Sequence, residues 1–218
     1  MATNMSTNSV SKLRFLPDGA NDYLRRRATE AWGLALIITA LVLALTFLSF
    51  SVDDPSANHA ITGPVYNFLG VPGAWVADLV LQTIGLAGGL ICLTLLAWGW
   101  RMISHRGLPL LWLNMSTLPV MLVGASFVLA AFSVPQNWPL ASGLGGWVGD
   151  GLFRSAVHLG QEAGLPMSPG LYGLIAAPVV LILIGISFAL SPSEWRALSF
   201  GAWRSVRHTQ NLVSGLGQ

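Results

Sequence analysis

The sequence predicts an all-α protein, an integral membrane bundle of four transmembrane helices with both termini in the cytoplasm. Composition gives the first reason: 53% of the 218 residues are hydrophobic and 9% are charged, whereas soluble domains carry about a quarter charged residues. Four uncharged stretches also reach the roughly 20 residues needed to cross a hydrocarbon core of about 30 Å. Finally, all 11 lysines and arginines except Arg154 fall in segments that four such helices place on one side.

The four expected spans are about 31–50, 73–100, 110–133 and 171–190. The first lies between Glu30 and Asp53 and exceeds the roughly 7–15 residues of a signal-peptide apolar core. The second is longer than a span requires, so we expect Asp78 near the membrane surface, where a charge costs less than at mid-bilayer. Pro119 and Pro178 lie inside the third and fourth spans, which membrane helices tolerate when neighbours bond the freed carbonyl groups.

These spans divide the chain into three predicted parts, which are a basic cytoplasmic segment (1–30), the membrane domain (31–190) and a cytoplasmic tail (191–218). In the tail, Ser191 and Glu194 have the spacing of a helix capping box. The tail is then either an amphipathic helix on the membrane surface or the start of a linker. Positive residues favour the cytoplasmic side of a membrane protein. Those expected to fix this topology are Arg25, Arg26, Arg27, Arg101, Arg106, Arg196, Arg204 and Arg207.

The motif Asp53-Asp54-Pro55-Ser56 follows directly after the first span, on the side predicted to face away from the cytoplasm. The two carboxylates are expected to stop the helix from sliding into the bilayer, and Pro55 ends it because proline lacks a backbone N–H. His59 lies close enough in sequence to form a metal site with Asp53 and Asp54. A solvated loop histidine is the simpler interpretation, so no metal ion is predicted.

Glycines indicate two further features. Gly85 and Gly89 lie four residues apart in the second span, a spacing that lets two membrane helices approach closely, although apolar segments also contain it by chance. The glycine-rich segment 143–151 lacks the spacing of a dinucleotide-binding loop and is predicted to be a flexible outer loop. Residues 147–162, which overlap its end, are suited to a short surface helix.

Motifs for catalysis are absent from the sequence. The single lysine, Lys12, does not lie in the Gly-Lys-Ser/Thr context of a phosphate-binding loop, so we expect no ATP hydrolysis, no catalytic residue and no cofactor in this chain. The spans contain no pair of charged residues near the middle of the membrane, which counts against an ion-coupled transporter. A small transporter or channel stays the alternative function, because Asn114, Ser116 and Thr117 cluster near the inner end of the third span. A membrane enzyme using a metal at His59 is the remaining alternative.

Four segments of the chain, taken in order, are similar to a known family. They are SFSVDDPS after the first span, NFLGVPGAWVADLVLQTIGLAG leading into the second, WGWR at its end, and NWPLASGLGGWVGDGL after the third. Over about residues 25–190, the chain therefore resembles the N-terminal membrane domain of the FtsK/SpoIIIE family of bacterial DNA translocases.

The resemblance implies a membrane anchor that localises a DNA-translocating motor to the division septum of the bacterial inner membrane and contacts other division proteins. It further implies a role in cell division and chromosome partition, with the lipid bilayer and septal proteins as partners. The family's ATPase motor, which uses ATP and Mg²⁺, follows a long linker and is expected to be missing here. Self-association and DNA binding would then occur through that missing motor, and this chain would be either a truncated protein or an anchor alone.

Overall fold

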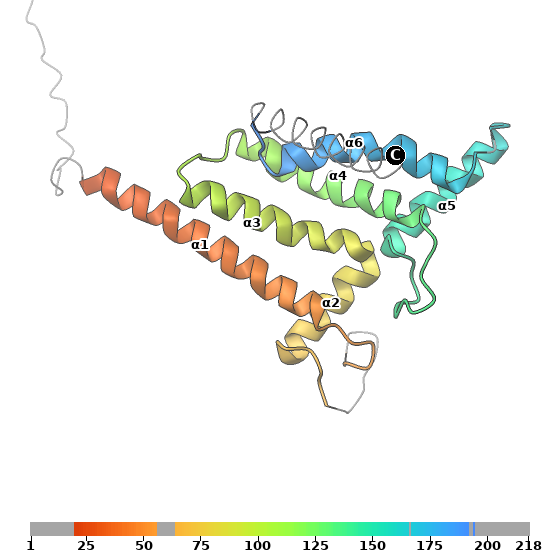
Figure 1. Ribbon diagram of the computed structural model, residues 1–218, viewed down its shortest axis with the longest axis horizontal. Coiled ribbons are helices and arrows are strands. Elements are labelled where there is room, and N and C mark those ends of the chain that lie inside the picture. Colours follow the sequence, from red (N-terminus) through yellow and green to blue (C-terminus); the bar gives the residue numbers. More distant parts are fainter. Residues whose placement is uncertain (1–19, 56–63, 166, 192–193, 195–218) are drawn as a thin grey trace, which may run out of the picture.

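The computed structural model describes residues 20–55, 64–165, 167–191 and 194, and this part of the chain is helical with no strand (Figure 1). The all-α prediction is therefore confirmed. The elements in chain order are α1 (Ala20–Leu48), α2 (Gly70–Ile84), the 3₁₀-helix η1 (Gly85–Gly88), α3 (Gly89–Ile103), α4 (Leu111–Ala130), α5 (Gly146–Glu162) and α6 (Pro169–Ser187).

Four stretches of these helices are long and apolar enough to cross a membrane, which confirms the predicted number of spans. They are Asn21–Leu48, Gly70–Ile103, Leu111–Ala130 and Pro169–Ser187. Large apolar side chains along them are exposed, among them Leu41, Leu174 and Leu181, because lipid rather than protein surrounds these faces. α1 begins at Ala20 instead of residue 31, since no proline or glycine interrupts the helix before the span. The division into 1–30, 31–190 and 191–218 stays a prediction.

The spans associate as two helix pairs, α1 with α3 and α4 with α6, rather than as one symmetrical bundle (Figure 1). α1 and α3 cross at two glycines. A Cβ atom on Gly33 would lie 2.8 Å from the carbonyl oxygen of Gly99, and one on Gly99 would lie 2.6 Å from the carbonyl oxygen of Gly33. The two backbones therefore touch directly, as small residues allow in lipid.

The second pair packs in the same manner with different residues. A Cβ on Gly173 of α6 would lie 2.7 Å from the Cβ of Ala131, just after α4, and one on Gly124 would lie 3.0 Å from Val180. Val180 belongs to a buried apolar cluster with Ala87 of η1 and Ala125 of α4. η1 thus contributes to the core of the second pair and connects it to the first.

The second span, predicted over about 73–100, lies within Gly70–Ile103, but it is not one continuous helix, because the chain breaks into α2, η1 and α3 at Gly85, whose φ is +60°. Only glycine adopts this backbone conformation without strain. The Leu86 N–H donates to the Leu144 carbonyl at 3.0 Å, and the Ser126 hydroxyl donates to the Ile84 carbonyl at 3.0 Å. Neighbouring segments therefore bond the backbone groups near the break, and α2 turns away from α3 across the end of α1 (Figure 1).

The flexible loop predicted over 143–151 is also wrong, because this segment is packed and enters α5. A Cβ on either Gly145 or Gly149 would collide with the carbonyl oxygen of Ser126 in α4. The Asp150 carboxylate accepts a hydrogen bond from the Gly143 N–H at 2.7 Å. These glycines let the start of α5 touch the α4 backbone, and α5 confirms the helix expected over 147–162.

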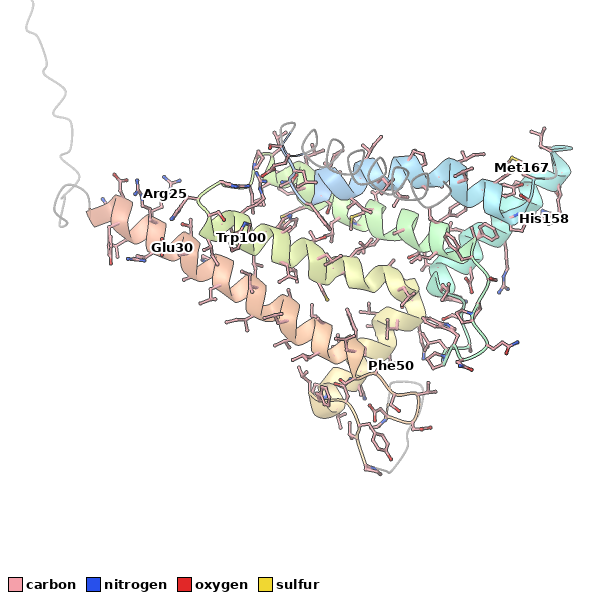
Figure 2. All side chains as sticks on the ribbon, viewed as in Figure 1. Arg25, Glu30, Phe50, Trp100, His158 and Met167 are labelled. Atoms are coloured by element: carbon pink, nitrogen blue, oxygen red, sulfur yellow. The ribbon has the colours of Figure 1, made fainter. Side chains whose placement is uncertain are left out.

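The helices have two ends of opposite charge. We call the end that holds the described arginines of α1 and α3 the basic end, and the end that holds Asp54, Asp78 and Asp150 the acidic end. In Figure 2, Arg25, Glu30 and Trp100 mark the basic end, and His158 lies at the far side of the molecule. At the basic end, the Trp98 indole N–H donates to the Ser187 carbonyl at 2.7 Å and joins α3 to α6.

The glycine crossing between α1 and α3 gives a direct test of this fold. We expect Gly99→Ala to lower the free energy of unfolding by about 1–3 kcal/mol, because the added methyl group overpacks a backbone contact. Gly89→Ala is the matched control in the same helix, since a Cβ on Gly89 meets no atom within 4 Å. Denaturant unfolding in detergent micelles measures both variants, and equal stabilities would contradict the crossing.

Candidate functional site

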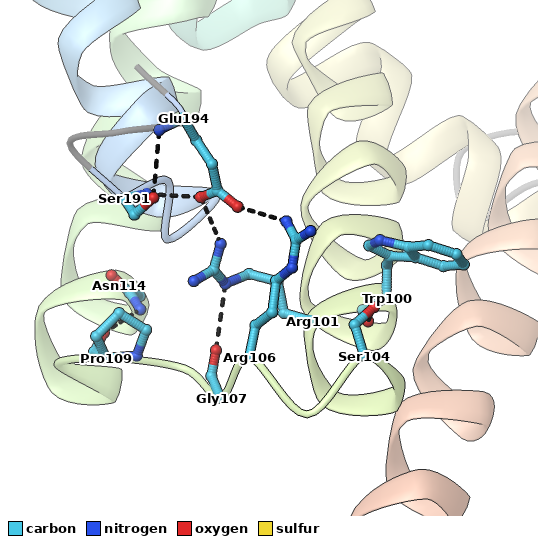
Figure 3. Close-up of polar contacts among 9 residues, drawn as sticks. All are labelled: Trp100, Arg101, Ser104, Arg106, Gly107, Pro109, Asn114, Ser191 and Glu194. Carbon is cyan, nitrogen blue, oxygen red and sulfur yellow. Dashed lines mark hydrogen bonds and ion pairs between the residues drawn. The ribbon is translucent and has the colours of Figure 1, made fainter. Parts of the chain in front are cut away.

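A charged cluster at the basic end holds the start of the C-terminal segment against α3 (Figure 3). Arg101, in the last turn of α3, is 7% exposed. Its Nη1 lies 2.8 Å from Oε2 of Glu194, and its Nε donates to the carbonyl of Gly107 at 3.2 Å. A buried charge is tolerated when it is paired and hydrogen-bonded in this way. We call Arg101, Arg106 and Glu194 the clamp.

Glu194 is the centre of the clamp. Its Oε1 accepts from Nη1 of Arg106 at 2.7 Å, and its Oε2 accepts from the Ser191 N–H at 2.7 Å as well as from Arg101. The Glu194 N–H in turn donates to the Ser191 hydroxyl at 3.3 Å. This reciprocal pattern is a capping box, so the capping box predicted from the sequence is confirmed.

The pKa of Glu194 lies far below its ordinary value of 4.5, at about 2. The hydrogen bond from the Ser191 N–H is the main cause, and the Arg101 guanidinium lowers the pKa further by hydrogen bonding and by its charge. Burial acts in the opposite direction and raises it. Glu194 is therefore a carboxylate throughout the physiological pH range, and it balances part of the arginine charge at this end.

The three arginines of the sequence Arg25-Arg26-Arg27 lie inside α1, near its start. Arg27 is bound to Glu30 at 2.7 Å, and its guanidinium lies 5.3 Å from the ring centroid of Tyr23. Arg25 and Arg26 are exposed and form no ion pair with any described residue.

Glu30 also joins α1 to the end of α3. Its Oε1 lies 3.2 Å from Nε2 of His105, which has φ of +53° in the turn after α3. The five described arginines that are expected to fix the topology all lie at the basic end. Three of them belong to the first turns of α1, and the other two, Arg101 and Arg106, share Glu194. The remaining three, Arg196, Arg204 and Arg207, lie outside the described residues.

Polar side chains at the start of α4 form local bonds. The Asn114 amide donates to the Pro109 carbonyl at 2.8 Å. The hydroxyls of Ser116 and Thr117 donate to the Leu113 carbonyl at 3.1 and 2.8 Å. The three residues that motivated a transporter or channel therefore stabilise their own helix and the turn before it.

At the acidic end, Asp54 fastens the loop after α1. It is 4% exposed, and its two carboxylate oxygens accept from the N–H groups of Tyr66 at 2.6 Å and Asn67 at 2.9 Å. The Asn67 side chain donates to the Thr46 carbonyl in α1 at 2.9 Å. The buried acid of the Asp-Asp pair is thus a structural residue that ties the start of α2 to the end of α1.

The other residues of the Asp53–Ser56 motif are placed differently. Asp53 is exposed, and its N–H donates to the Ser51 hydroxyl at 3.3 Å. Pro55 follows in the described loop, whereas Ser56 and His59 lie outside the described residues. Within the part of the chain that the structure describes, no three histidine, cysteine, aspartate or glutamate side chains form a metal-binding group.

The structure does not bring Gly85 and Gly89 into one helix-packing contact. Gly85 lies at the break, where a Cβ would collide with the Leu144 carbonyl, and Gly89 faces open space. Asp78 is 8% exposed and accepts from the Gln82 amide at 2.5 Å. It lies in α2 at the acidic end, as a buried hydrogen-bonded group rather than a solvated one.

Sequence reasoning missed several residues that fix this geometry. Gly33 and Gly99 form the crossing of α1 and α3, Ser126 bonds the broken helix, and Asn67 bonds the end of α1. Each acts on a partner that is distant in sequence, so no local spacing signals it.

With its four apolar helices, their lipid-exposed faces and the clamp, the protein belongs to a recognisable class. It is a multi-pass membrane domain with four spans. Residues 25–202 match the family model described as the 4TM region of DNA translocase FtsK/SpoIIIE. The chain belongs to this family, as the quoted segments indicated. No solved structure matches it.

Curated relatives agree with this assignment. The chain is 37% identical over 140 residues to the DNA translocase FtsK of Bradyrhizobium diazoefficiens, covering 64% of this chain and 17% of that protein. It is 34% identical over 165 residues to the DNA translocase FtsK of Brucella melitensis (73% and 19%). It is 29% identical over 213 residues to that of Azospirillum brasilense (96% and 32%). The chain thus spans less than a third of these relatives and matches their N-terminal membrane region.

The two adjacent aspartates give a matched test of the loop. We expect Asp54→Asn to lower the free energy of unfolding by about 1–3 kcal/mol, because one amide oxygen cannot replace two carboxylate oxygens and a buried N–H loses its partner. Asp53→Asn should change it by less than about 0.5 kcal/mol, since Asp53 is an exposed side chain. Unfolding in detergent micelles measures both, and similar losses would disprove the role of Asp54.

The clamp predicts a specific pH dependence. Because the folded pKa of Glu194 is lowered to about 2, its contribution to stability is complete above its ordinary value of 4.5 and is lost as the pH falls through about 2. We expect the difference in unfolding temperature between the native chain and Glu194→Gln to stay constant from about pH 7 to about pH 5 and to vanish near pH 2.

Glu162→Gln is the control for this experiment, because Glu162 is exposed and lies 3.6 Å from His158 at the other side of the molecule. Its substitution should leave the unfolding temperature nearly unchanged over the same range. A Glu194→Gln difference that disappears already near pH 4.5 would show that the carboxylate is not held by the clamp.

Proposed function

We propose that this chain is the membrane anchor of a septal DNA translocase, with its basic end in the cytoplasm of the bacterial inner membrane. It would localise the motor to the division septum and contact other division proteins there. The proposal assigns no catalysis and no cofactor to this chain. ATP, Mg²⁺, DNA and self-association would belong to the remaining length of the protein, in keeping with the name DNA translocase that the relatives carry.

The observation that carries the proposal is the clamp. Family relatives extend well beyond the matched region, so a force on the following part would reach the membrane domain through the segment after α6. Glu194 ties that segment to α3 through Arg101 and to the α3–α4 connection through Arg106. A pull on the segment is then shared by both helix pairs instead of acting on α6 alone.

Charge supports the orientation. The basic end holds five described arginines, of which three are paired with the two carboxylates of Glu30 and Glu194. The acidic end and α5 hold Asp53, Asp54, Asp78, Asp150 and Glu162 with Arg154 as the single described arginine. Positively charged ends of membrane helices stay in the cytoplasm, so the segment that follows α6 would emerge there.

A fluorescent fusion tests the proposal. We expect residues 1–218, fused at the C-terminus to a fluorescent protein, to concentrate at the septum of dividing cells, because the anchor alone would carry the localisation contacts. Protease added to spheroplasts should leave the C-terminal tag intact, which controls for orientation. Uniform labelling of the cell membrane, or a tag cleaved from outside, would contradict the proposal.

A further inference from the structure

The arginines at the basic end fall into two groups by their partners. Arg27, Arg101 and Arg106 are each bound to a carboxylate at 2.7 or 2.8 Å. Arg25 and Arg26 are exposed and have no ion-pair partner among the described residues. Of the five described arginines at this end, Arg25 and Arg26 are therefore the two whose guanidinium groups can bind something outside the protein.

The length of α1 places these two groups at a definite height. α1 has 29 residues, so it is about 43 Å long, whereas the hydrocarbon core is about 30 Å thick and needs about 20 residues. The uncharged stretch after Glu30 begins at Ala31, and the 18 residues from Ala31 to Leu48 are enough to cross the hydrocarbon core, so its boundary falls near Ala31. Arg25 and Arg26 lie about one and a half turns before Ala31, which is the level of the lipid phosphates rather than of bulk solvent.

Aromatic side chains support this height. Trp32 is 67% exposed, Trp100 of α3 is 62% exposed and Trp112 at the start of α4 is 87% exposed. Exposed tryptophans gather where the hydrocarbon core meets the headgroups. Trp32 lies seven residues after Arg25, so both are on one face of α1, with the indole below the guanidinium.

The side chains of Asp22, Arg25, Arg26 and Thr29 frame an open hollow on the surface of α1. Asp22 contributes one negative charge to the two positive ones, so the free groups have a net charge of +1. This balance matches a phosphate with a single negative charge. Guanidinium groups bind phosphate oxygens in pairs of parallel hydrogen bonds, and the partly exposed Leu36 and Leu43, which lie on the same face of α1 as Trp32, offer apolar surface below for acyl chains.

We propose that Arg25 and Arg26 form a binding site for the headgroup phosphate of a singly charged anionic phospholipid, with its acyl chains along the Trp32 face of α1. The site is separate from the clamp, and the inference does not rest on the proposed anchoring function.

The test compares short-chain phosphatidylglycerol with short-chain phosphatidylcholine. The whole chain is purified in an uncharged detergent, and native mass spectrometry measures the association constant of each lipid. We expect tighter binding of phosphatidylglycerol, and a loss of about fivefold in its association constant for each arginine removed in Arg25→Gln/Arg26→Gln, since a basic residue near the surface contributes about that factor.

Arg27→Gln/Glu30→Gln is the matched control. It also replaces two charged residues of the same helix, but it keeps the net charge and the two free arginines, so the association constant should change by less than about twofold. Arg25→Lys/Arg26→Lys keeps both charges and should keep the preference for phosphatidylglycerol. Unfolding temperatures confirm that all variants are folded.

Three results would overturn the proposal. The first is equal affinity of the native chain for the two lipids, and the second is an equal loss in the Arg25/Arg26 variant and the Arg27/Glu30 control. The third is full displacement of phosphatidylglycerol by inorganic phosphate, which would assign the two arginines to a soluble phosphate instead of a lipid.

Discussion

The architecture depends on the backbone groups that the break at Gly85 leaves without helical partners. Inside a bilayer no water can bond such groups, and each unpaired one costs several kcal/mol. The Leu144 carbonyl and the Ser126 hydroxyl supply the missing bonds. Leu144 lies in the segment just before α5 and Ser126 lies in α4, so bonding the break also docks the first helix pair against the second.

The two ends of the helices are built from different chemistry. At the acidic end, the carboxylates of Asp54 and Asp150 hold the loops in place by accepting hydrogen bonds from backbone N–H groups. At the basic end, charged side chains do this work, and Glu30 and Glu194 each serve two partners. The hydrogen bonds at the acidic end fix the conformation of the loops. At the basic end, the positive charge that no carboxylate balances can interact with anionic lipid headgroups.

The sequence predicted the features that arise from local pattern. Uncharged runs revealed the four spans, and the spacing of Ser191 and Glu194 revealed the capping box. The sequence did not reveal the break inside the second span, because a small-residue spacing around Gly85 is compatible both with a helix-packing face and with a break. The distinction depends on Leu144, which lies far along the chain. The crossing of Gly33 and Gly99 had no signal for the same reason, since its two members lie on different helices.

The clamp limits how this region can change in evolution. Glu194 is one carboxylate shared by Arg101 and Arg106, so exchanging the charges of one pair leaves the third residue facing a like charge. A single compensating mutation can restore a simple ion pair, but it does not restore the clamp. Inverting the charges of the clamp therefore takes three substitutions together, a base in place of Glu194 and an acid in place of each arginine.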